Sequence, residues 1–137
     1  MADAKIVDIK GVQWELKDEV ARNKIAEFEN LYKDYGNIGV DNASVFCTRN
    51  KNMLLFQGQT SLQMSLGVVY KIANIPTDLV KKNTKASGPI FDYSKGNVVG
   101  MVYRPEDGDG IYLYFTNGIT TEERIYTFQL ISYQQTM

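Results

Sequence analysis

The chain has 137 residues, of which 44% are hydrophobic and 23% charged, and its 15 basic and 16 acidic side chains give a formal net charge of −1. This length and composition fit one compact domain with a short appendage, and the near-neutral charge argues against the basic surface of a nucleic-acid-binding protein. The sequence has no histidine and a single cysteine, which excludes a Ser-His-Asp triad, most zinc sites and an intramolecular disulfide, so the composition argues against an enzyme.

The N-terminal residues show no apolar segment of the kind found in a secretory signal. The longest apolar runs, at residues 53–56 and 111–115, are four and five residues long. A membrane-spanning helix needs roughly 20 apolar residues. We therefore expect a protein that folds in a cytoplasm and does not insert into a membrane.

Residues 1–17 predict a short β-hairpin. Apolar and polar side chains alternate from residue 12 onward, which is the period of two typical of a strand. Gly11 supplies the positive φ that a tight turn needs. Because an isolated hairpin is only marginally stable in water, its apolar side must pack against another structure. We expect the hairpin to make these contacts through Val12, Trp14 and Leu16.

Residues 18–36 predict a helix. Asp18 is a favourable N-cap, and Gly36 is a natural residue for ending a helix. Between them, apolar side chains recur at alternating spacings of four and three, which is the seam of a coiled coil. The seam residues are Ala21, Ile25, Phe28, Tyr32 and Tyr35. The same spacing also suits an amphipathic helix packed on its own domain, and spacing alone does not separate the two.

From residue 44 onward, short apolar runs alternate with turn signals, as in an antiparallel sandwich or barrel. We expect strands at residues 45–48, 53–65, 68–73, 97–104, 111–115 and 125–133. Gly58 predicts a bulge within the second of these strands. Residues 74–96 predict a long connection with weak helical character near residues 78–82.

The carboxylates and the single cysteine are the side chains with the chemistry of a metal or catalytic site. The acidic loop at residues 106–110 could offer oxygen ligands to calcium, but it lacks the frame of an EF-hand, and an acidic hairpin loop is the commoner explanation. Glu122 and Glu123 are adjacent on an extended segment and point to opposite faces, so they cannot act as an acid–base pair. Cys47 lies in an apolar run and is most simply a small buried residue. We expect no catalytic residue, metal site or cofactor.

The sequence contains nine tyrosines. Tyr112 and Tyr114 share one face of their predicted strand, while the alternating apolar positions share the other. Outward-facing phenols suit a subunit interface, a ligand contact or a plain sheet surface, and the sequence leaves these three alternatives open. For a bound ligand, we expect contacts from Tyr112, Tyr114, Tyr126 and the connection at residues 74–96.

Two segments resemble parts of bacteriophage virion proteins. Residues 6–25, IVDIKGVQWELKDEVARNKI, resemble a hairpin in phage fibre and baseplate proteins that leads directly into a trimeric coiled coil, with Lys-Gly here in place of an Asn-Gly turn and Trp14 in place of a tyrosine. Residues 67–76, GVVYKIANIP, resemble a strand and loop of the small β-sandwich heads of phage fibres. In those heads, a strand after a glycine turn, as at residues 110–114, and a final aromatic strand, as at residues 126–133, complete the sandwich.

The resemblance implies a non-enzymatic virion protein that forms a homotrimeric fibre on the head or tail of a phage. The hairpin at residues 1–17 would attach it to other virion proteins, the helix at residues 18–36 would trimerise it, and an antiparallel, jelly-roll-like β-sandwich at residues 44–137 would bind a polysaccharide on the host surface. The protein would be assembled in the host bacterial cytoplasm and would not bind nucleic acid. One alternative is a decoration or connector protein that joins virion proteins without host binding. Another is a cellular carbohydrate-binding module, which should be monomeric.

Overall fold

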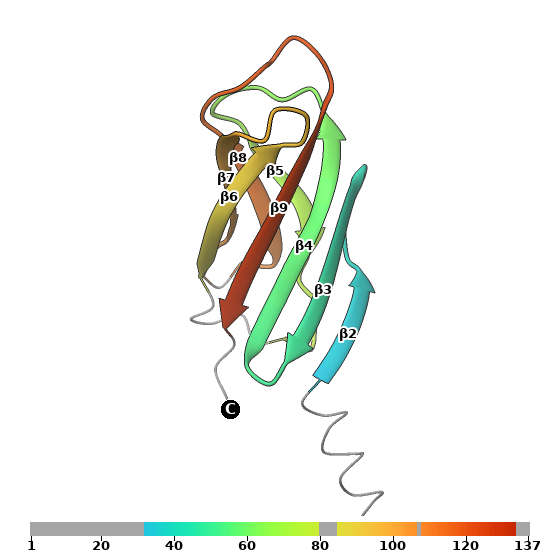
Figure 1. Ribbon diagram of the computed structural model, residues 1–137. Coiled ribbons are helices and arrows are strands. Elements are labelled where there is room, and N and C mark those ends of the chain that lie inside the picture. The colour runs from blue at the N-terminus through green and yellow to red at the C-terminus, as the bar shows by residue number, and fades with distance from the viewer. Residues whose placement is uncertain (1–31, 80–84, 107, 134–137) are drawn as a thin grey trace, which may run out of the picture. The chain divides into compact units, whose positions relative to one another are not determined.

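The computed structural model describes residues 32–79, 85–106 and 108–133, and every regular element within these ranges is a β-strand (Figure 1). The strands are β2 (Tyr32–Asn37), β3 (Ala43–Asn50), β4 (Met53–Leu62), β5 (Val69–Asn74), β6 (Ala86–Asp92), β7 (Val98–Arg104), β8 (Gly110–Phe115) and β9 (Arg124–Tyr133). The prediction of a mainly β, antiparallel domain is confirmed. Within the described ranges there is no helix with the length and apolar character that a membrane crossing requires.

The strands form a single curled sheet in the order β2-β3-β4-β9-β6-β7-β8-β5. The sheet curls until its first and last strands approach each other. The segment after β2 reaches β5, where the Val40 N–H donates to the Ile72 carbonyl at 2.9 Å and the Asn74 N–H donates to the Ile38 carbonyl at 3.3 Å. An isolated antiparallel bridge lies between these two bonds. The contact closes the sheet around its core.

The inward side of the curled sheet forms the apolar core. Figure 1 shows β5, β7 and β8 behind β4, β9 and β6, and the buried side chains lie between these strands. Alternate residues of a strand point inward, so on β9 Tyr126 and Phe128 are buried while Gln129 is exposed. Phe115 of β8 meets the Tyr126 ring edge-on, with the ring centroids 4.7 Å apart. The outward-facing residues of the same strands form the surface on which the candidate site lies.

Two glycines allow neighbouring backbones to approach closely as the sheet curls. A Cβ at Gly58 would collide with the carbonyl oxygen of Ser44 on β3, and a Cβ at Gly100 would collide with the carbonyl oxygen of Tyr114 on β8. Glycine in a strand commonly marks such a close approach. The pairing of β4 with both β3 and β9 continues without a shift through Gly58, so the bulge predicted there is wrong.

Residues 32–37 form a strand, which corrects part of the predicted neck helix. Tyr32 and Tyr35, expected on the coiled-coil seam, lie in β2 beside β3. The Asp34 side chain accepts the Gly36 N–H at 2.8 Å, and Gly36 has a φ of 71°, a backbone conformation that is incompatible with an α-helix. The other predicted seam and attachment residues lie outside the described residues: Ala21, Ile25, Phe28, Val12, Trp14 and Leu16.

The connection predicted over residues 74–96 contains strand β6, which is a second correction. Gly88 and Pro89 concealed this strand in the sequence because both residues are disfavoured inside strands. The register of β6 with β9 begins at Ile90, so Pro89 lies outside that ladder and its missing N–H is tolerated. On the other side of β6, Pro89 lies opposite Met101 of β7. The correction matters for function because β6 forms one wall of the candidate site.

Candidate functional site

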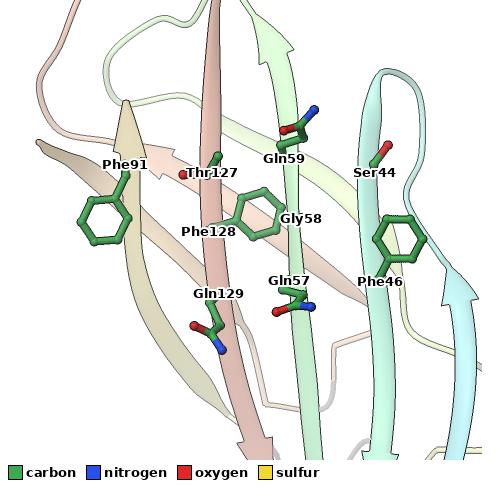
Figure 2. Close-up of a pocket in the computed structure, with 9 residues that line it drawn as sticks. All are labelled: Ser44, Phe46, Gln57, Gly58, Gln59, Phe91, Thr127, Phe128 and Gln129. Atoms are coloured by element: carbon green, nitrogen blue, oxygen red, sulfur yellow. The ribbon is translucent and has the colours of Figure 1, made fainter. Parts of the chain in front are cut away.

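The outer face of β3, β4, β9 and β6 carries an open groove of about 640 Å³ (Figure 2). The residues that line it are Ser44, Phe46, Gln57, Gly58, Gln59, Phe91, Thr127, Phe128 and Gln129. They come from the consecutive strands β3 and β4 and from β6 and β9, which lie farther along the chain and become their neighbours through the strand order of the sheet. The groove is therefore a product of the fold and not of a local motif.

Strand register arranges the outward side chains in two rows that cross the strands. The first row consists of Ser44, Gln59, Thr127 and Phe91. The second row consists of Phe46, Gln57 and Gln129. Each row includes one phenylalanine, and Figure 2 shows Phe46 and Phe91 on opposite sides of the polar residues. With adjacent strands about 4.8 Å apart, the distance from β3 to β6 is roughly 14 Å.

Both phenylalanines expose much of their rings to solvent. Phe46 is 49% exposed and Phe91 is 37% exposed, although each lies between residues whose side chains are buried. A phenylalanine ring has no polar atom with which to interact with water, so keeping two of them outward on one surface is unfavourable for the isolated domain. Apolar surface of this kind, bordered by polar side chains, is characteristic of a binding site.

Three glutamine side chains between the rings have unused hydrogen-bonding groups. Gln57, Gln59 and Gln129 make no side-chain hydrogen bond to any other described residue. Gln63, at the end of β4, differs because its Nε2 donates to the Thr120 carbonyl at 2.9 Å. Each free amide offers two donor hydrogens and an acceptor oxygen. The groove therefore presents amide donors and acceptors between two apolar rings.

Gly58 contributes only backbone to the centre of the groove. It lies between Gln57 and Gln59 on β4 and pairs with Val45 and Phe128, whose side chains are buried, so its side-chain position faces the core. No larger residue fits at Gly58 because its Cβ would collide with the Ser44 carbonyl oxygen. The floor is therefore formed by backbone and by the side of a buried ring.

The groove lining contains no charged side chain. An ion pair lies beside the groove, where β6 ends and β9 begins. There the Arg124 Nε donates to Asp92 Oδ2 at 2.7 Å, and both side chains are shielded, with 13% and 2% of their surface exposed. The hydrogen bond from Arg124 holds the pKa of Asp92 below its ordinary value, so the carboxylate stays ionised. This pair fixes the strand ends that carry Phe91 and Thr127.

Tyr112 and Tyr114 occupy the outer face of β8, as the sequence indicated, but they do not line the groove. Both are half-buried, and the alternating residues of β8 form part of the core. Tyr112 stacks on Tyr103 of β7, with ring centroids 5.7 Å apart and an angle of 26° between the planes. These phenols cover the outer surface at β7 and β8, outside the four strands of the groove.

Tyr126 is a core residue. It has no exposed surface, and burial raises the pKa of its hydroxyl above the ordinary value. It shares the inward face of β9 with Phe128. We therefore leave it out of the candidate ligand contacts.

Cys47 is buried, and the acidic residues Asp109, Glu122 and Glu123 interact with neighbouring side chains. Cys47 is fully buried, and burial raises the pKa of its thiol to about 12. Asp109 of the acidic loop lies 3.6 Å from the Lys71 ammonium group. Glu123 accepts a hydrogen bond from the Ser61 hydroxyl at 2.6 Å, and Glu122 pairs with Arg124 at 2.8 Å. Among the described residues there is no cluster of three or more acidic or sulfur ligands that could hold a metal ion.

The sequence contained a signal for the groove that residue chemistry alone did not reveal. Phe46 lies between Val45 and Cys47, and Phe91 lies between Ile90 and Asp92, so each phenylalanine is out of phase with the buried residues beside it. The pattern predicts an outward aromatic side chain on each of two strands. It does not show that the two strands face the same groove, because that depends on the order of β3, β4, β9 and β6.

Comparison with protein-family models, with curated proteins and with solved structures gives no match to this chain.

Proposed function

We propose that the chain is a non-enzymatic subunit of a bacteriophage fibre, on the head or tail, that binds the host surface through the groove on its β domain. The observation that carries the binding role is the presence of two exposed phenylalanine rings and three free glutamine amides on one open surface. The resemblance of residues 6–25 and 67–76 to phage fibre and baseplate proteins supports the virion role.

The proposed fibre is a homotrimer with three functional parts. The hairpin at residues 1–17 attaches to neighbouring virion proteins through Val12, Trp14 and Leu16. The proposed neck helix trimerises the chain through Ala21, Ile25 and Phe28, which precede strand β2 in the sequence. The β domain, a single curled antiparallel sheet, forms the head. Three identical grooves on one neck bind a repetitive surface with higher avidity than one groove, because the second and third contacts are intramolecular.

Sedimentation and cell binding test this proposal together. The full chain should sediment at three times the mass of one chain, and the double variant Ile25→Asp with Phe28→Asp should sediment as a monomer because charge is placed on the seam. Labelled trimer should bind bacterial cells more strongly than the monomeric variant. A trimer that binds no cell of a broad bacterial panel would instead support a decoration or connector protein. A monomeric wild-type chain would contradict the fibre.

A further inference from the structure

We infer that the groove binds an uncharged glycan that lies across strands β3, β4, β9 and β6, with sugar rings against Phe46 and Phe91. The inference names the ligand of the proposed host-binding site and therefore rests on the proposed function. It follows from the chemistry of the lining residues and from their register across the strands. It also follows from the poor fit of this lining to anionic ligands and to protein partners.

The lining combines the two kinds of contact that a sugar ring can make. One side of many pyranose rings is a patch of C–H groups, which packs on a flat aromatic face, and the rim carries hydroxyl groups that both donate and accept hydrogen bonds. Phe46 and Phe91 supply exposed aromatic surface. Amides such as Gln57 and Gln129 supply donors and acceptors, which match hydroxyl groups of either orientation.

The register sets the direction and minimum size of the ligand. Phe46 and Phe91 lie on the first and fourth strands of the groove, so the two aromatic surfaces are separated by roughly 14 Å across the sheet. One sugar ring cannot contact both at this separation. An oligosaccharide segment that crosses the strands can contact both and can pass over the β4 backbone at Gly58, which lines the groove.

The absence of charge in the lining selects against anionic ligands. Phosphate and carboxylate groups are bound in proteins by arginine, lysine or clustered backbone N–H groups, and none of the lining side chains is basic. Nucleic acids are disfavoured for the same reason, since neutralisation of phosphates dominates their affinity. An uncharged glycan has no ionic group that would be left unpaired in this groove.

The composition of the lining also disfavours a protein partner. Cores of protein interfaces are enriched in tyrosine, tryptophan, phenylalanine, methionine and arginine and depleted in serine. Phenylalanine is the single enriched type in the groove lining, which also has Ser44 and Thr127 beside its three glutamines. A hydroxyl-rich ligand matches this surface better than the apolar core of a protein interface.

Affinity electrophoresis of the full chain tests the inference. Native gels would contain dextran, mannan, galactan or soluble starch as uncharged probes, and alginate or heparin as anionic probes. We expect at least one uncharged polysaccharide to retard the protein, and the retardation to persist at high salt because no ion pair is involved. Migration unaffected by every uncharged probe, or retarded by the anionic probes alone, would overturn the inference.

Variants locate the binding surface. Phe46→Ala and Phe91→Ala should each lower the affinity measured from the retardation by about fivefold, since each removes one aromatic contact of the kind that contributes about 1 kcal/mol. Phe46→Trp should retain binding because it preserves an aromatic face. Tyr133→Ala is the matched control, since this tyrosine is 65% exposed at the far end of β9 and does not line the groove. Equal retardation of wild type, Phe46→Ala and Phe91→Ala would contradict a ligand in this groove.

Failure of this inference is distinguishable from failure of the proposed function. A trimer that binds bacterial cells but is not retarded by any uncharged polysaccharide would contradict the glycan inference and leave the fibre proposal intact. A monomeric chain whose retardation depends on Phe46 and Phe91 would support the glycan site and contradict the trimeric fibre.

Discussion

Arg124 holds the carboxylate of Asp92 with two hydrogen bonds, from Nε to Oδ2 at 2.7 Å and from Nη2 to Oδ1 at 3.1 Å. Asp92 Oδ1 also accepts the backbone N–H groups of Ser94 and Lys95 at 3.1 and 3.2 Å. One buried carboxylate thereby joins the last residue of β6, the turn that follows it and the first residue of β9. The ion pair helps to hold the groove wall in place, because the groove residue Phe91 directly precedes Asp92 on β6.

Replacing Asp92 with Asn should lower the melting temperature by several degrees, because the shielded guanidinium of Arg124 would lose its ionic partner. Thermal unfolding followed by circular dichroism measures the change. The matched control is Glu122→Gln, which removes an exposed partner of the same arginine and should leave the melting temperature almost unchanged. Equal effects of the two substitutions would show that Asp92 has no special structural role.

The ion pair should also make stability depend on acidic pH. The pKa of Asp92 is held below its ordinary value of 3.8 chiefly by the hydrogen bond from Arg124, so the folded state favours the ionised carboxylate. This contribution is fully present above the pKa of the unfolded chain and is lost as the pH falls through the lower pKa of the folded state. The difference in melting temperature between wild type and Asp92→Asn should stay constant from neutral pH to weakly acidic pH and then shrink below about pH 4. A difference that grows on acidification would contradict this assignment.

Replacing Tyr126 with Phe should raise the free energy of unfolding by about 1 kcal/mol, because the buried hydroxyl has no hydrogen-bond partner among the described residues. The matched control is Tyr70→Phe, which removes a hydroxyl that accepts the Ser65 N–H at 2.8 Å. That substitution should lower stability by about 1 kcal/mol. Denaturant unfolding measures the change in the free energy of unfolding of each variant. A loss of stability in Tyr126→Phe would show that the Tyr126 hydroxyl has a hydrogen-bond partner.

Cys47 should be unreactive in the folded protein. Its side chain is fully buried, and with a pKa of about 12 only about one thiol in ten thousand is ionised near pH 8. A disulfide reagent such as DTNB should label the native chain at the rate of its unfolding and label the denatured chain at once. Rapid stoichiometric labelling of native protein would instead indicate an accessible thiolate and reopen the question of nucleophilic chemistry.

The sequence was sufficient to predict most of the β structure, because alternating apolar residues mark strands that cover one side of a core. The pattern of Ile111, Leu113 and Phe115 predicted both β8 and its inward face, and these three residues are fully buried. Strand β6 was missed because Gly88 and Pro89 mask its alternation, and local sequence does not show which neighbouring ladders a proline can avoid.

The candidate site was harder to predict than the strands. Aromatic chemistry directed attention to the tyrosines, whereas the phase of alternation placed Tyr126 inward and Phe46 outward. The groove itself depends on pairing between β4 and β9, which brings Gln57 opposite Gln129 across a long sequence separation. Such pairing is set by the whole core and not by residues near either glutamine in the chain.

Sedimentation equilibrium of the full chain tests the fibre proposal most directly. We predict a single species at three times the mass of one chain, independent of salt, and conversion to one chain mass in the double variant Ile25→Asp with Phe28→Asp. A wild-type protein that sediments at the mass of one chain throughout the accessible concentration range would contradict the trimeric fibre.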